Sequence, residues 1–354
     1  MSGRDIGDAV NRRILAEAED RLQGFHERPF LALAERCELS EEEVMERLRA
    51  MLASGTVLRL RQILPSTALT QGCLMAWRLH EPEALNAAFD WLREHDPATG
   101  HIVIRRPEDA AAPGADYRLW TTLKLPLSAD LPAHCRMLAE RIGASEYACM
   151  PVVGMFSLSV GHVRRAGLAP GALQDAPPAM QVPPHPQLDE QEWSVLRSFR
   201  EPLSAAEVIS TPWEGRARAL GMEPSAYYAI ARRLAEKGAL GRFAAALNHG
   251  MPANPHSGTG SSALFMWAVP PGMEEQAGAT CGQHICMTHC YWRSGAERFG
   301  GVQIMGVVHA PSPELLMAHK AAIDAALSRR GIPVLHTATL HTVRSLVRPS
   351  RVEW

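Results

Sequence analysis

An internal repeat is the feature of this sequence that most constrains its fold. The segment LKLPLSADLPAHCRMLAERIG, beginning at Leu123, parallels VHAPSPELLMAHKAAIDAALSRRG, beginning at Val308. Further upstream, CLMAWRL around Trp77 parallels LFMWAVP around Trp267. Similarity at two separated places predicts that the chain contains two copies of one structural unit, which bury their apolar faces together.

A proline-rich segment separates the two copies. Residues 166–187, AGLAPGALQDAPPAMQVPPHPQ, contain six prolines in twenty-two residues. This composition disfavours regular helix or strand and favours an extended, semi-rigid spacer. At about 3.1 Å per residue, such a spacer reaches roughly 60 Å. The two copies are therefore able to pack face to face as a pseudo-dimer.

Each copy begins with a pattern typical of a winged helix-turn-helix. Three short helices that end at a glycine, followed by a β-rich segment, predict this motif. In the first copy these features are Val10–Leu22, a helix beginning at Ser40 with Glu43 as its capping-box partner, and Gly55. In the second copy they are Leu188–Phe199, Pro212–Leu220, Pro224–Lys237 and Gly238.

The remainder of each copy has the order βαββαβ, which predicts a ferredoxin-like unit. In the first copy the elements are a strand at Cys73, a helix over Pro82–Glu94, strands HIVIRR and YRLWTTLKL, a helix over Leu131–Ile142 and a strand over Cys149–Val160. In the second copy they are strand ALFMWAV, a helix, strands HICMTHCYW and GVQIMGVV, a helix over Pro313–Arg329 and a strand over Val334–Val343.

The predicted fold class is therefore α+β, a tandem duplicate of winged helix-turn-helix and ferredoxin-like units of the Lrp/AsnC-like kind, forming a pseudo-dimer. The expected domains are a first helix-turn-helix unit over 1–64 and a first ferredoxin-like unit over 65–165. The linker over 166–187 follows. A second helix-turn-helix unit over 188–248 and a second ferredoxin-like unit over 249–354 complete the chain.

Composition excludes several classes of protein. Hydrophobic residues make up 46% of the chain and charged residues 21%, and no apolar run approaches the roughly 18 residues that a membrane span needs. The N-terminal residues also lack the pattern of a signal peptide. We therefore expect a soluble, cytoplasmic protein with no membrane partner. Because the seven cysteines are an odd number and widely scattered, we expect free thiols rather than a disulfide framework.

One functional hypothesis is a transcription regulator. A helix-turn-helix followed by a βαββαβ unit resembles the leucine-responsive (Lrp/AsnC) regulators, which implies DNA as a partner. The charge argues against it, since 36 Lys and Arg face 38 Asp and Glu, with a formal net charge of −2. The first candidate recognition helix also begins with Glu41, Glu42 and Glu43, which would repel phosphates. The second candidate recognition helix carries Arg232 and Arg233 and is therefore less repulsive to phosphates, but we do not expect DNA binding.

A second resemblance is more specific. The duplicated architecture carries THCYWR from Thr288, LNHG around His249 and DYRLW around Tyr117. With these motifs it resembles, across both halves, the siroheme decarboxylases of heme d1 and alternative heme biosynthesis. The resemblance is strongest to the fused NirDL type, related to AhbA and AhbB. One departure is that a Trp-Pro-Tyr-Asn-Leu-like element expected after the signature is replaced by SGAERFGGVQIM, and only DYRLW in the first half is similar to it.

The resemblance implies a reaction and its participants. The implied reaction removes carbon dioxide from the C12 and C18 acetates of siroheme and gives 12,18-didecarboxysiroheme. The iron then belongs to the tetrapyrrole substrate, so no added cofactor is expected, although a bound heme is an alternative. The implied partners are NirG- or NirH-type relatives, and a homo-oligomer is compatible with the sequence. A heme or tetrapyrrole sensor without catalysis is the remaining alternative.

The strand HICMTHCYWR carries the candidate catalytic residues. Side chains alternate between the faces of a strand, so we expect Met287, His289, Tyr291 and Arg293 on one face and Cys286, Thr288, Cys290 and Trp292 on the other. Decarboxylation leaves a carbon that needs a proton, and a histidine, which titrates near neutral pH, is suited to deliver it. His289 is the expected acid, with Tyr291 as relay or alternative donor and Arg293 holding a carboxylate. A solvent-facing polar strand is the structural alternative.

The eight carboxylates of siroheme also require several fixed cations. The expected carboxylate contacts in the first half are Arg105 and Arg106, at the end of the strand equivalent to the signature strand, and Tyr117, Arg118 and Lys124 on the next strand. In the second half they are His249, at the pocket mouth or on the iron, and His309, which aligns with Lys124. For each of these, a surface charge is the alternative.

Two further hypotheses are set aside at this stage. Cys281, Cys286 and Cys290, with His284 and His289 nearby, suggest a zinc or iron–sulfur site, but there is no C-x-x-C pair, and Cys290 and His289 should point to opposite faces of the strand. We therefore predict no metal site. The matched Trp77 and Trp267 are expected in the core rather than stacked on a ring.

Overall fold

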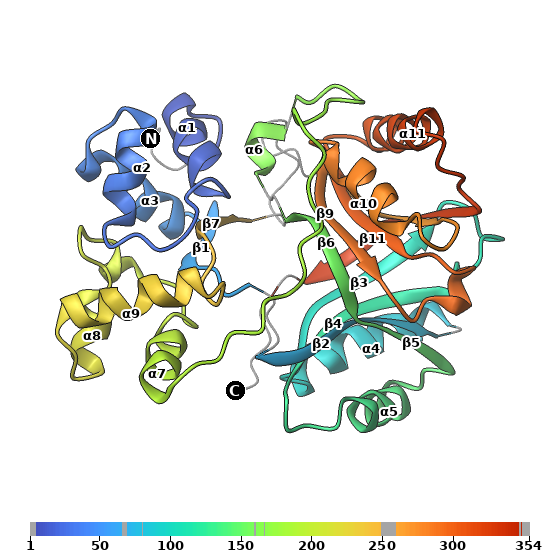
Figure 1. Cartoon of the computed structure of the whole chain (residues 1–354), viewed down its shortest axis with the longest axis horizontal. Helices are drawn as coiled ribbons and strands as arrows, with labels where there is room; N and C mark the ends of the chain where they lie inside the picture. The colour runs from blue at the N-terminus through green and yellow to red at the C-terminus, as the bar shows by residue number, and fades with distance from the viewer. Residues whose placement is uncertain are drawn as a thin grey trace. The chain divides into compact units, whose positions relative to one another are not determined.

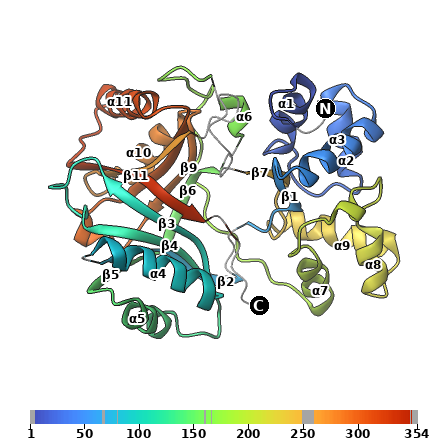
Figure 2. The same ribbon diagram turned by 180° about the vertical axis from the view of Figure 1, so that it is seen from behind.

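In the computed structural model, the described residues are 5–65, 69–79, 81–158, 161–165, 167–248, 260–346 and 348. The chain forms two compact units, and each unit combines segments of both sequence copies (Figures 1 and 2). Unit 1 contains residues 1–67, 159–167 and 184–260, and unit 2 contains residues 68–158, 168–183 and 261–354. The duplicated halves are therefore interleaved rather than arranged one after the other.

Unit 1 consists of the two helix-turn-helix segments. The first supplies α1 (Ala9–Ala18), α2 (Pro29–Cys37), α3 (Glu41–Ala53) and β1 (Val57–Gln62). The second supplies α7 (Glu190–Ser198), the 3₁₀ helix η2 (Ala205–Glu207), α8 (Glu214–Ala219), α9 (Pro224–Glu236) and β7 (Phe243–Leu247), and the short α6 (His162–Arg165) joins them. Strands β1 and β7 pair antiparallel, with Val57 opposite Leu247. The wing strands of the two copies thus form one two-stranded sheet.

The helix boundaries of unit 1 follow from local chemistry. The Ser40 hydroxyl accepts the Glu43 backbone N–H at the start of α3, as the sequence predicts. Gly55 and Gly238 follow α3 and α9 with φ of 74° and 72°, a left-handed conformation that costs glycine little. Both predicted helix ends are confirmed.

The charges on the candidate recognition helices are used inside unit 1. On α3, Glu41 pairs with Arg28 at 2.5 Å and Glu43 pairs with Arg47 at 3.0 Å. On α9, Arg232 forms an ion pair with Glu27. Two of the three carboxylates expected to repel DNA, Glu41 and Glu43, and the guanidinium group of Arg232 thus have ion-pair partners.

Unit 2 is built on one antiparallel sheet in the order β5-β2-β4-β3-β11-β8-β10-β9-β6. The first copy supplies β2 (Thr70–Arg78), α4 (Pro82–His95), β3 (Thr99–Pro107), β4 (Tyr117–Pro126), α5 (Leu131–Ile142), β5 (Glu146–Met150) and β6 (Val152–Leu158). The second copy supplies β8 (Ser261–Ala268), α10 (Glu274–Gln283), β9 (Met287–Arg293), the 3₁₀ helix η3 (Glu297–Phe299), β10 (Ile304–Ala310), α11 (Pro313–Arg329) and β11 (His336–Leu346). Both copies have the predicted βαββαβ order.

The two copies exchange their last strands. In the second copy, β11 pairs first with β8 of its own copy and then with β3 of the first copy. In the first copy, the predicted strand over 149–160 is divided at Pro151 into β5, which pairs with β2, and β6, which pairs with β9 of the second copy. Because β5 and β6 are the two ends of the sheet and only Pro151 separates them, the sheet closes on itself as a barrel.

Side chains fill both faces of this sheet. The inner face holds an apolar cluster from both copies, which we call the inner cluster: Ala76, Tyr117, Trp120, Ala148, Met150, Leu264, Met266, Ala268, Ala296, Phe299, Val302, Met305, Ala338 and Leu340. Outside, α4 and α5 cover the strands of the first copy, and α10 and α11 cover those of the second (Figure 1). Trp77 and Trp267 are fully buried on this outer face, so their predicted place in the core is confirmed.

The proline-rich segment lacks regular structure, as predicted, but it is attached to unit 2 along part of its length. Gln181 and Met155 exchange two backbone hydrogen bonds of 2.8 Å, and the Gln174 N–H donates to the Gln283 carbonyl at 2.9 Å. The segment therefore covers the edge near β6 instead of acting only as a spacer. All seven cysteines are free thiols. Within the described part of the chain, no helix has both the length and the apolar character needed to cross a membrane.

Candidate functional site

The strand pairing shows which residues of the two copies are equivalent. Gly72 lies opposite Lys124 in the first copy, and Ser262 lies opposite His309 in the second. The predicted equivalence of Lys124 and His309 is therefore confirmed as a sheet position. The same pairing places Val103 opposite Trp120 and, in the second copy, Tyr291 opposite Met305.

This equivalence reveals a His-x-x-x-Arg pattern that occurs in both copies. Residues His101–Arg105 (HIVIR) on β3 correspond to His289–Arg293 (HCYWR) on β9. Since all neighbouring strands are antiparallel, β3 and β9 run in the same direction in the closed sheet. Both histidines consequently belong to the same end of the barrel, where Lys124 and His309 lie near the ends of β4 and β10.

His101 is a site residue that was not predicted from the sequence. The signal was present, because the same two residue types recur at the same spacing on the second strand of each copy. Each strand also carries an extra residue close to its histidine. In the second copy the pairing shifts between Met287 and His289, and in the first copy it shifts across His101, between Thr99 and Ile102.

This bulge also corrects the predicted facing of Met287. Met287 packs in the outer cluster with Cys286, Cys290 and Trp292 rather than on the face of His289. The inserted residue reverses the alternation at that point, since a one-residue shift moves a side chain to the opposite face. His289 and Tyr291 lie on the inner face, because they pair with Val307, which packs against the inner cluster, and with Met305, which belongs to it.

Hydrogen bonds around Thr288 orient His289. The Thr288 hydroxyl donates to the Val307 carbonyl at 2.8 Å, and its oxygen lies 3.2 Å from His289 Nδ1 and 3.5 Å from His309 Nδ1. Because the hydroxyl proton is already donated, the oxygen acts as acceptor toward the rings. We therefore assign the Nδ1–H tautomer to His289, with Nε2 as the nitrogen that takes or gives the exchangeable proton.

Tyr291 and Arg293 continue the same strand. The Tyr291 ring lies nearly parallel to the His289 ring, with centroids 6.2 Å apart, and the Arg293 guanidinium lies 4.5 Å from the Tyr291 centroid. Arg293 is buried and donates from Nη1 to the Met150 carbonyl at 2.9 Å. Among the described residues its Nε has no hydrogen-bond partner. The predicted constellation of three residues is thus present as a stacked row.

Arg105 is the counterpart of Arg293 and has a similar environment. It is buried on the inner face and approaches the Leu340 carbonyl at 3.4 Å and the Thr342 hydroxyl at 3.3 Å. Its Nε also lacks a hydrogen-bond partner within the described ranges. Burial lowers the pKa of Arg105 to about 10, which leaves this side chain charged at neutral pH. Burial also lowers the pKa of Arg293. The barrel therefore contains two equivalent, incompletely hydrogen-bonded guanidinium groups.

The structure separates the other predicted binding residues. Arg106 is exposed on the outer face, in a hollow shared with Glu108 and His341, because neighbouring strand residues face opposite sides. Tyr117 belongs to the inner cluster, and its hydroxyl donates to Glu146 at 2.7 Å. Tyr117 and Lys124 are seven residues apart on β4, about 23 Å at the usual strand rise.

Two further predicted residues complete this account. Arg118 Nε donates to the Arg105 carbonyl at 3.3 Å, across the pair of strands β3 and β4. His249 lies outside the described residues. The residues that the structure brings to one end of the barrel are therefore His289, Lys124 and His309, joined by His101.

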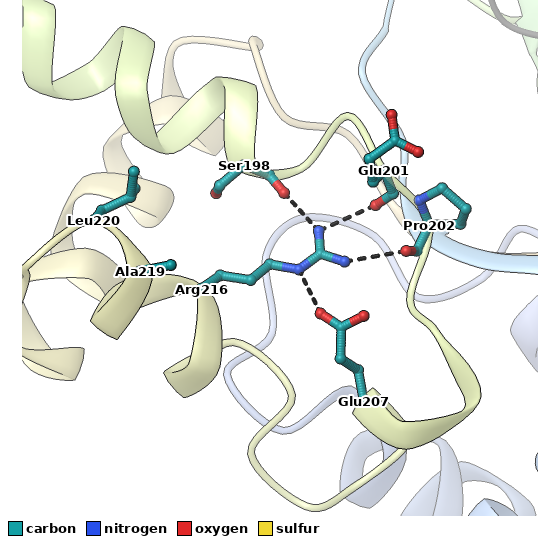
Figure 3. Close-up of a pocket in the computed structure, with 7 residues that line it drawn as sticks. All are labelled: Ser198, Glu201, Pro202, Glu207, Arg216, Ala219 and Leu220. Atoms are coloured by element: carbon teal, nitrogen blue, oxygen red, sulfur yellow. Dashed lines mark hydrogen bonds and ion pairs between the residues drawn. The ribbon is translucent and has the colours of Figure 1, made fainter.

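A hollow in unit 1 is a structural feature rather than a second site (Figure 3). The Arg216 side chain points into it and donates to the carbonyls of Ser198, Glu201 and Pro202 at 2.5, 3.0 and 3.1 Å. Its Nε pairs with Glu207 at 2.9 Å. These contacts use most of the five guanidinium donors, so Arg216 ties the end of α7 to the following loop.

Known proteins resemble both a short N-terminal part of this chain and most of its length. A family model described as "Siroheme decarboxylase NirDL-like HTH domain" matches residues 12–57. A siroheme decarboxylase of Hydrogenobacter thermophilus is 22% identical over 305 residues, 85% of this chain and 84% of the relative. The siroheme decarboxylase NirDL subunit of Paracoccus denitrificans is 22% identical over 308 residues, 87% of this chain and 85% of the relative.

The fold is likewise that of a solved structure. The crystal structure of the siroheme decarboxylase NirDL matches with a TM-score of 0.65 at 19% identity, covering 96% of this chain and 94% of that chain. A second NirDL structure, in complex with an iron-uroporphyrin III analogue, matches with a TM-score of 0.64.

The fold and its repeated strands define a class of protein, the duplicated α+β proteins in which paired helix-turn-helix segments accompany a shared ferredoxin-like barrel. Within that class, the chain is similar to the siroheme decarboxylases of the fused NirDL type. The resemblance stated from the sequence is confirmed.

Proposed function

We propose that this protein is a siroheme decarboxylase, which removes carbon dioxide from the C12 and C18 acetates and gives 12,18-didecarboxysiroheme. The observation that carries the proposal is the paired His-x-x-x-Arg strands, which bring basic side chains of both copies to one end of a closed barrel. The names of the relatives support it, and one solved relative holds an iron-uroporphyrin analogue.

The charges of this end match the charges of the substrate. Siroheme presents carboxylates around a flat ring, and His101, His289, Lys124 and His309 come from both copies. The inner cluster fills the barrel, so the ring docks at the barrel end rather than inside. The guanidinium groups of Arg105 and Arg293, buried further along the same strands, add positive potential that favours bound carboxylates.

The reaction needs one proton for each carbon dioxide released. The bond between the methylene carbon and the carboxylate carbon breaks, its electron pair is delocalised into the conjugated ring, and carbon dioxide leaves. The methylene carbon then takes a proton, which we assign to Nε2 of protonated His289, and becomes a methyl group. Tyr291, stacked beside His289, is the relay or alternative donor. No net oxidation or reduction occurs.

The two copies are not equally equipped for this step. At the position of Tyr291 the first copy has Val103, and at the position of Thr288 it has Gly100. The first copy therefore has no counterpart of the Tyr291 hydroxyl, and none of the Thr288 hydroxyl that orients the histidine ring in the second copy. We assign catalysis to the second copy and substrate binding to both copies.

The participants follow from this assignment. The iron is part of the siroheme substrate, and we propose that no further cofactor takes part. A NirG- or NirH-type relative is a candidate partner, because relatives of this kind are expected beside the fused type. The DNA-binding alternative is disfavoured by the ion pairs that already engage α3 and α9. A sensor without catalysis would not require His289 and Tyr291 together.

The proposal is tested by anaerobic incubation of the purified protein with siroheme, followed by mass analysis of the tetrapyrrole. The expected product has lost two carbon dioxide units and retains its iron. The assay is run with and without a NirG- or NirH-type relative. If the protein binds siroheme but leaves it unchanged under both conditions, the proposed enzymatic activity is wrong and the protein is a tetrapyrrole carrier.

A further inference from the structure

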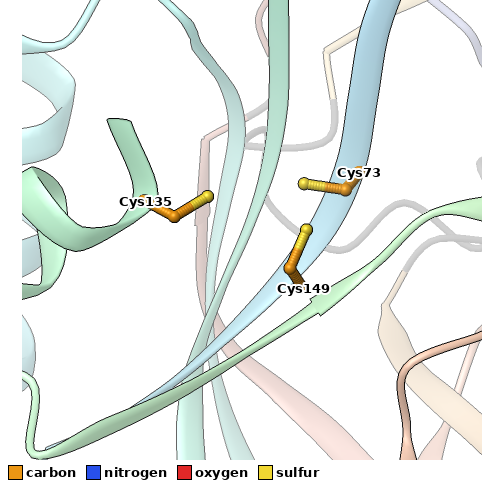
Figure 4. Close-up of side chains that lie close together, drawn as sticks. All are labelled: Cys73, Cys135 and Cys149. Carbon is orange, nitrogen blue, oxygen red and sulfur yellow. The ribbon is translucent and has the colours of Figure 1, made fainter. Parts of the chain in front are cut away.

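Four sulfur atoms converge on the outer face of the first copy, on the opposite face of the sheet from the proposed decarboxylation site. The thiols come from Cys73 on β2, Cys135 on α5 and Cys149 on β5 (Figure 4). Their Sγ atoms all lie within 4.8 Å of one another. The thioether of Met75 lies 3.4 Å from Cys73 Sγ and 3.7 Å from Cys135 Sγ. Three elements distant in sequence thus bring four sulfur atoms together.

These separations are close to those between the ligands of one bound metal ion. An ion about 2.3 Å from each sulfur in a tetrahedral or trigonal site holds the sulfurs roughly 3.8–4.0 Å apart. Cys73, Cys135 and Met75 are buried, at 5%, 1% and 0% exposure, whereas Cys149 is only partly buried. The partly exposed Cys149 leaves a route from solvent to the sulfurs.

The second copy supplies an internal comparison. The positions equivalent to Cys73, Met75, Cys135 and Cys149 are Ala263, Phe265, Lys320 and Thr339. The second copy forms the same strands and helices with none of these sulfur atoms. The fold therefore does not require thiols at these positions, and of the two copies only the first carries the sulfur cluster.

We propose that Cys73, Cys135, Cys149 and Met75 form a binding site for a thiophilic metal ion, and that the ion is Cu(I). Thiolate and thioether donors select soft ions, and the cluster contains no imidazole or carboxylate among the described residues. Structural zinc takes four thiolate or imidazole donors, so a thioether as fourth ligand favours Cu(I). Each cysteine that binds releases its thiol proton to solvent, and neither copper nor sulfur changes oxidation state.

Exposure indicates which thiol meets the ion first. Cys149 is partly buried, whereas Cys73 and Cys135 are buried. Cys149 is therefore the expected first ligand.

The test is a competitive titration of the full-length protein with Cu(I), held by a chromophoric Cu(I) chelator under anaerobic, reducing conditions. We expect one equivalent of Cu(I) to transfer to the protein and to raise its thermal unfolding midpoint. Loss of an outer-shell partner weakens metal binding by about 10–100-fold, and loss of a direct ligand costs at least as much. Cys149→Ala should therefore weaken Cu(I) binding by about 100-fold or more. Met75→Leu, which nearly preserves volume, should weaken binding about tenfold.

The matched control is Cys281→Ala, which removes another buried thiol, one that packs in the second copy. It should bind Cu(I) like the parent protein. No transfer of Cu(I), equal binding by Cys149→Ala and the parent, or a parallel titration showing preference for Zn(II) would each overturn the proposal. So would a disulfide between two of the three cysteines, found by peptide mapping of the protein purified with a thiol reductant. None of these readouts depends on decarboxylation.

Discussion

At the scale of single residues, the two copies keep the same strand positions but have diverged in chemistry. His101 and His289 are equivalent, yet only His289 is followed two residues later by a tyrosine and preceded by a threonine that orients its ring. The second copy alone thus carries both members of the proposed proton-donating pair, His289 and Tyr291, whereas the first copy has His101 without a tyrosine. Each histidine is therefore the control for the other.

His289→Ala should lower the turnover rate by about 10²–10⁴-fold, the range typical of general acid catalysis, while siroheme affinity changes little. His101→Ala should reduce affinity more than turnover, because it removes only a binding group. Single-turnover rates and binding titrations of the two variants separate these effects. Equal losses of turnover in both variants would contradict the assignment of catalysis to the second copy.

Cys290→Ser is the neighbouring control for His289→Ala. Cys290 is fully buried in the outer cluster, on the opposite face of β9 from His289. The variant should remain active. An inactive Cys290→Ser beside a nearly normal His289→Ala would show that the facing of the strand has been assigned wrongly.

His284 gives a stability prediction at the same scale. The side chain is 1% exposed, and neither ring nitrogen has a hydrogen-bond partner in the described part of the chain. Burial, with His319 nearby, lowers the pKa of His284 to about 4. The folded protein thus keeps this ring neutral while the unfolded chain protonates it near pH 6.5. The stability from this group is present above pH 6.5 and is lost as pH falls toward 4.

We therefore expect the thermal unfolding midpoint of the parent protein to decrease as the pH is lowered from 6.5 to 4. The midpoint of the His284→Leu variant should decrease less steeply. Thermal unfolding followed by circular dichroism across this range measures the difference. His185→Leu, which replaces an exposed histidine, should keep the parent slope. Identical slopes for the parent and His284→Leu would refute the account.

At the scale of elements, the exchanged strands make each copy depend on the other for a complete sheet. Strand β11 completes the first copy by pairing with β3, and β6 completes the second copy by pairing with β9. Arg293 strengthens one of these junctions, since it reaches from β9 to the Met150 carbonyl at the end of β5. Each copy alone would expose unpaired strand edges, which favour aggregation.

Residues 188–354 expressed alone should accordingly aggregate or unfold at lower temperature, and should bind siroheme poorly. Co-expression with residues 1–187 should restore a soluble complex, because the missing strands and basic groups then return. Size-exclusion chromatography and siroheme titration measure both outcomes. A monomeric second half that decarboxylates siroheme as fast as the whole chain would disprove the shared site.

The sequence predicted elements better than it predicted their pairing. Apolar periodicity and capping residues placed the helix over Pro313–Arg329 at the observed bounds, since these signals are local. The exchange of β6 and β11 was not predictable, because hydrogen bonding between distant strands leaves no local pattern. Alternation correctly separated His289 from Cys290, but it failed for Met287, where one inserted residue changes the face.

The same limit applies to the site residues. Arg105 and Arg106 were both predicted to contact substrate carboxylates, yet as neighbours on one strand they lie on opposite faces. The sulfur cluster was missed because Cys73, Cys135 and Cys149 are separated by 62 and 14 positions and form no short motif. Contacts that depend on tertiary structure could therefore not be predicted from the sequence, whereas the repeated strand positions could.

At the scale of the whole molecule, both sequence copies contribute to both compact units. In unit 2 the shared barrel is filled by the inner cluster and presents basic groups of both copies at one end. In unit 1, Glu41, Glu43 and Arg232 of the candidate recognition helices form ion pairs. The two copies thus share one barrel, and the proposed binding end draws on both.

The most direct test of this account is a crystal structure of the protein with siroheme, prepared anaerobically and trapped in the His289→Ala variant. The account predicts the ring at the barrel end that carries His101 and Lys124. It also predicts an acetate carboxylate within reach of the space left by the His289 ring, consistent with a contact of about 3 Å in the parent protein. Siroheme bound on the outer face beside Arg106, or in unit 1, would contradict the central claim.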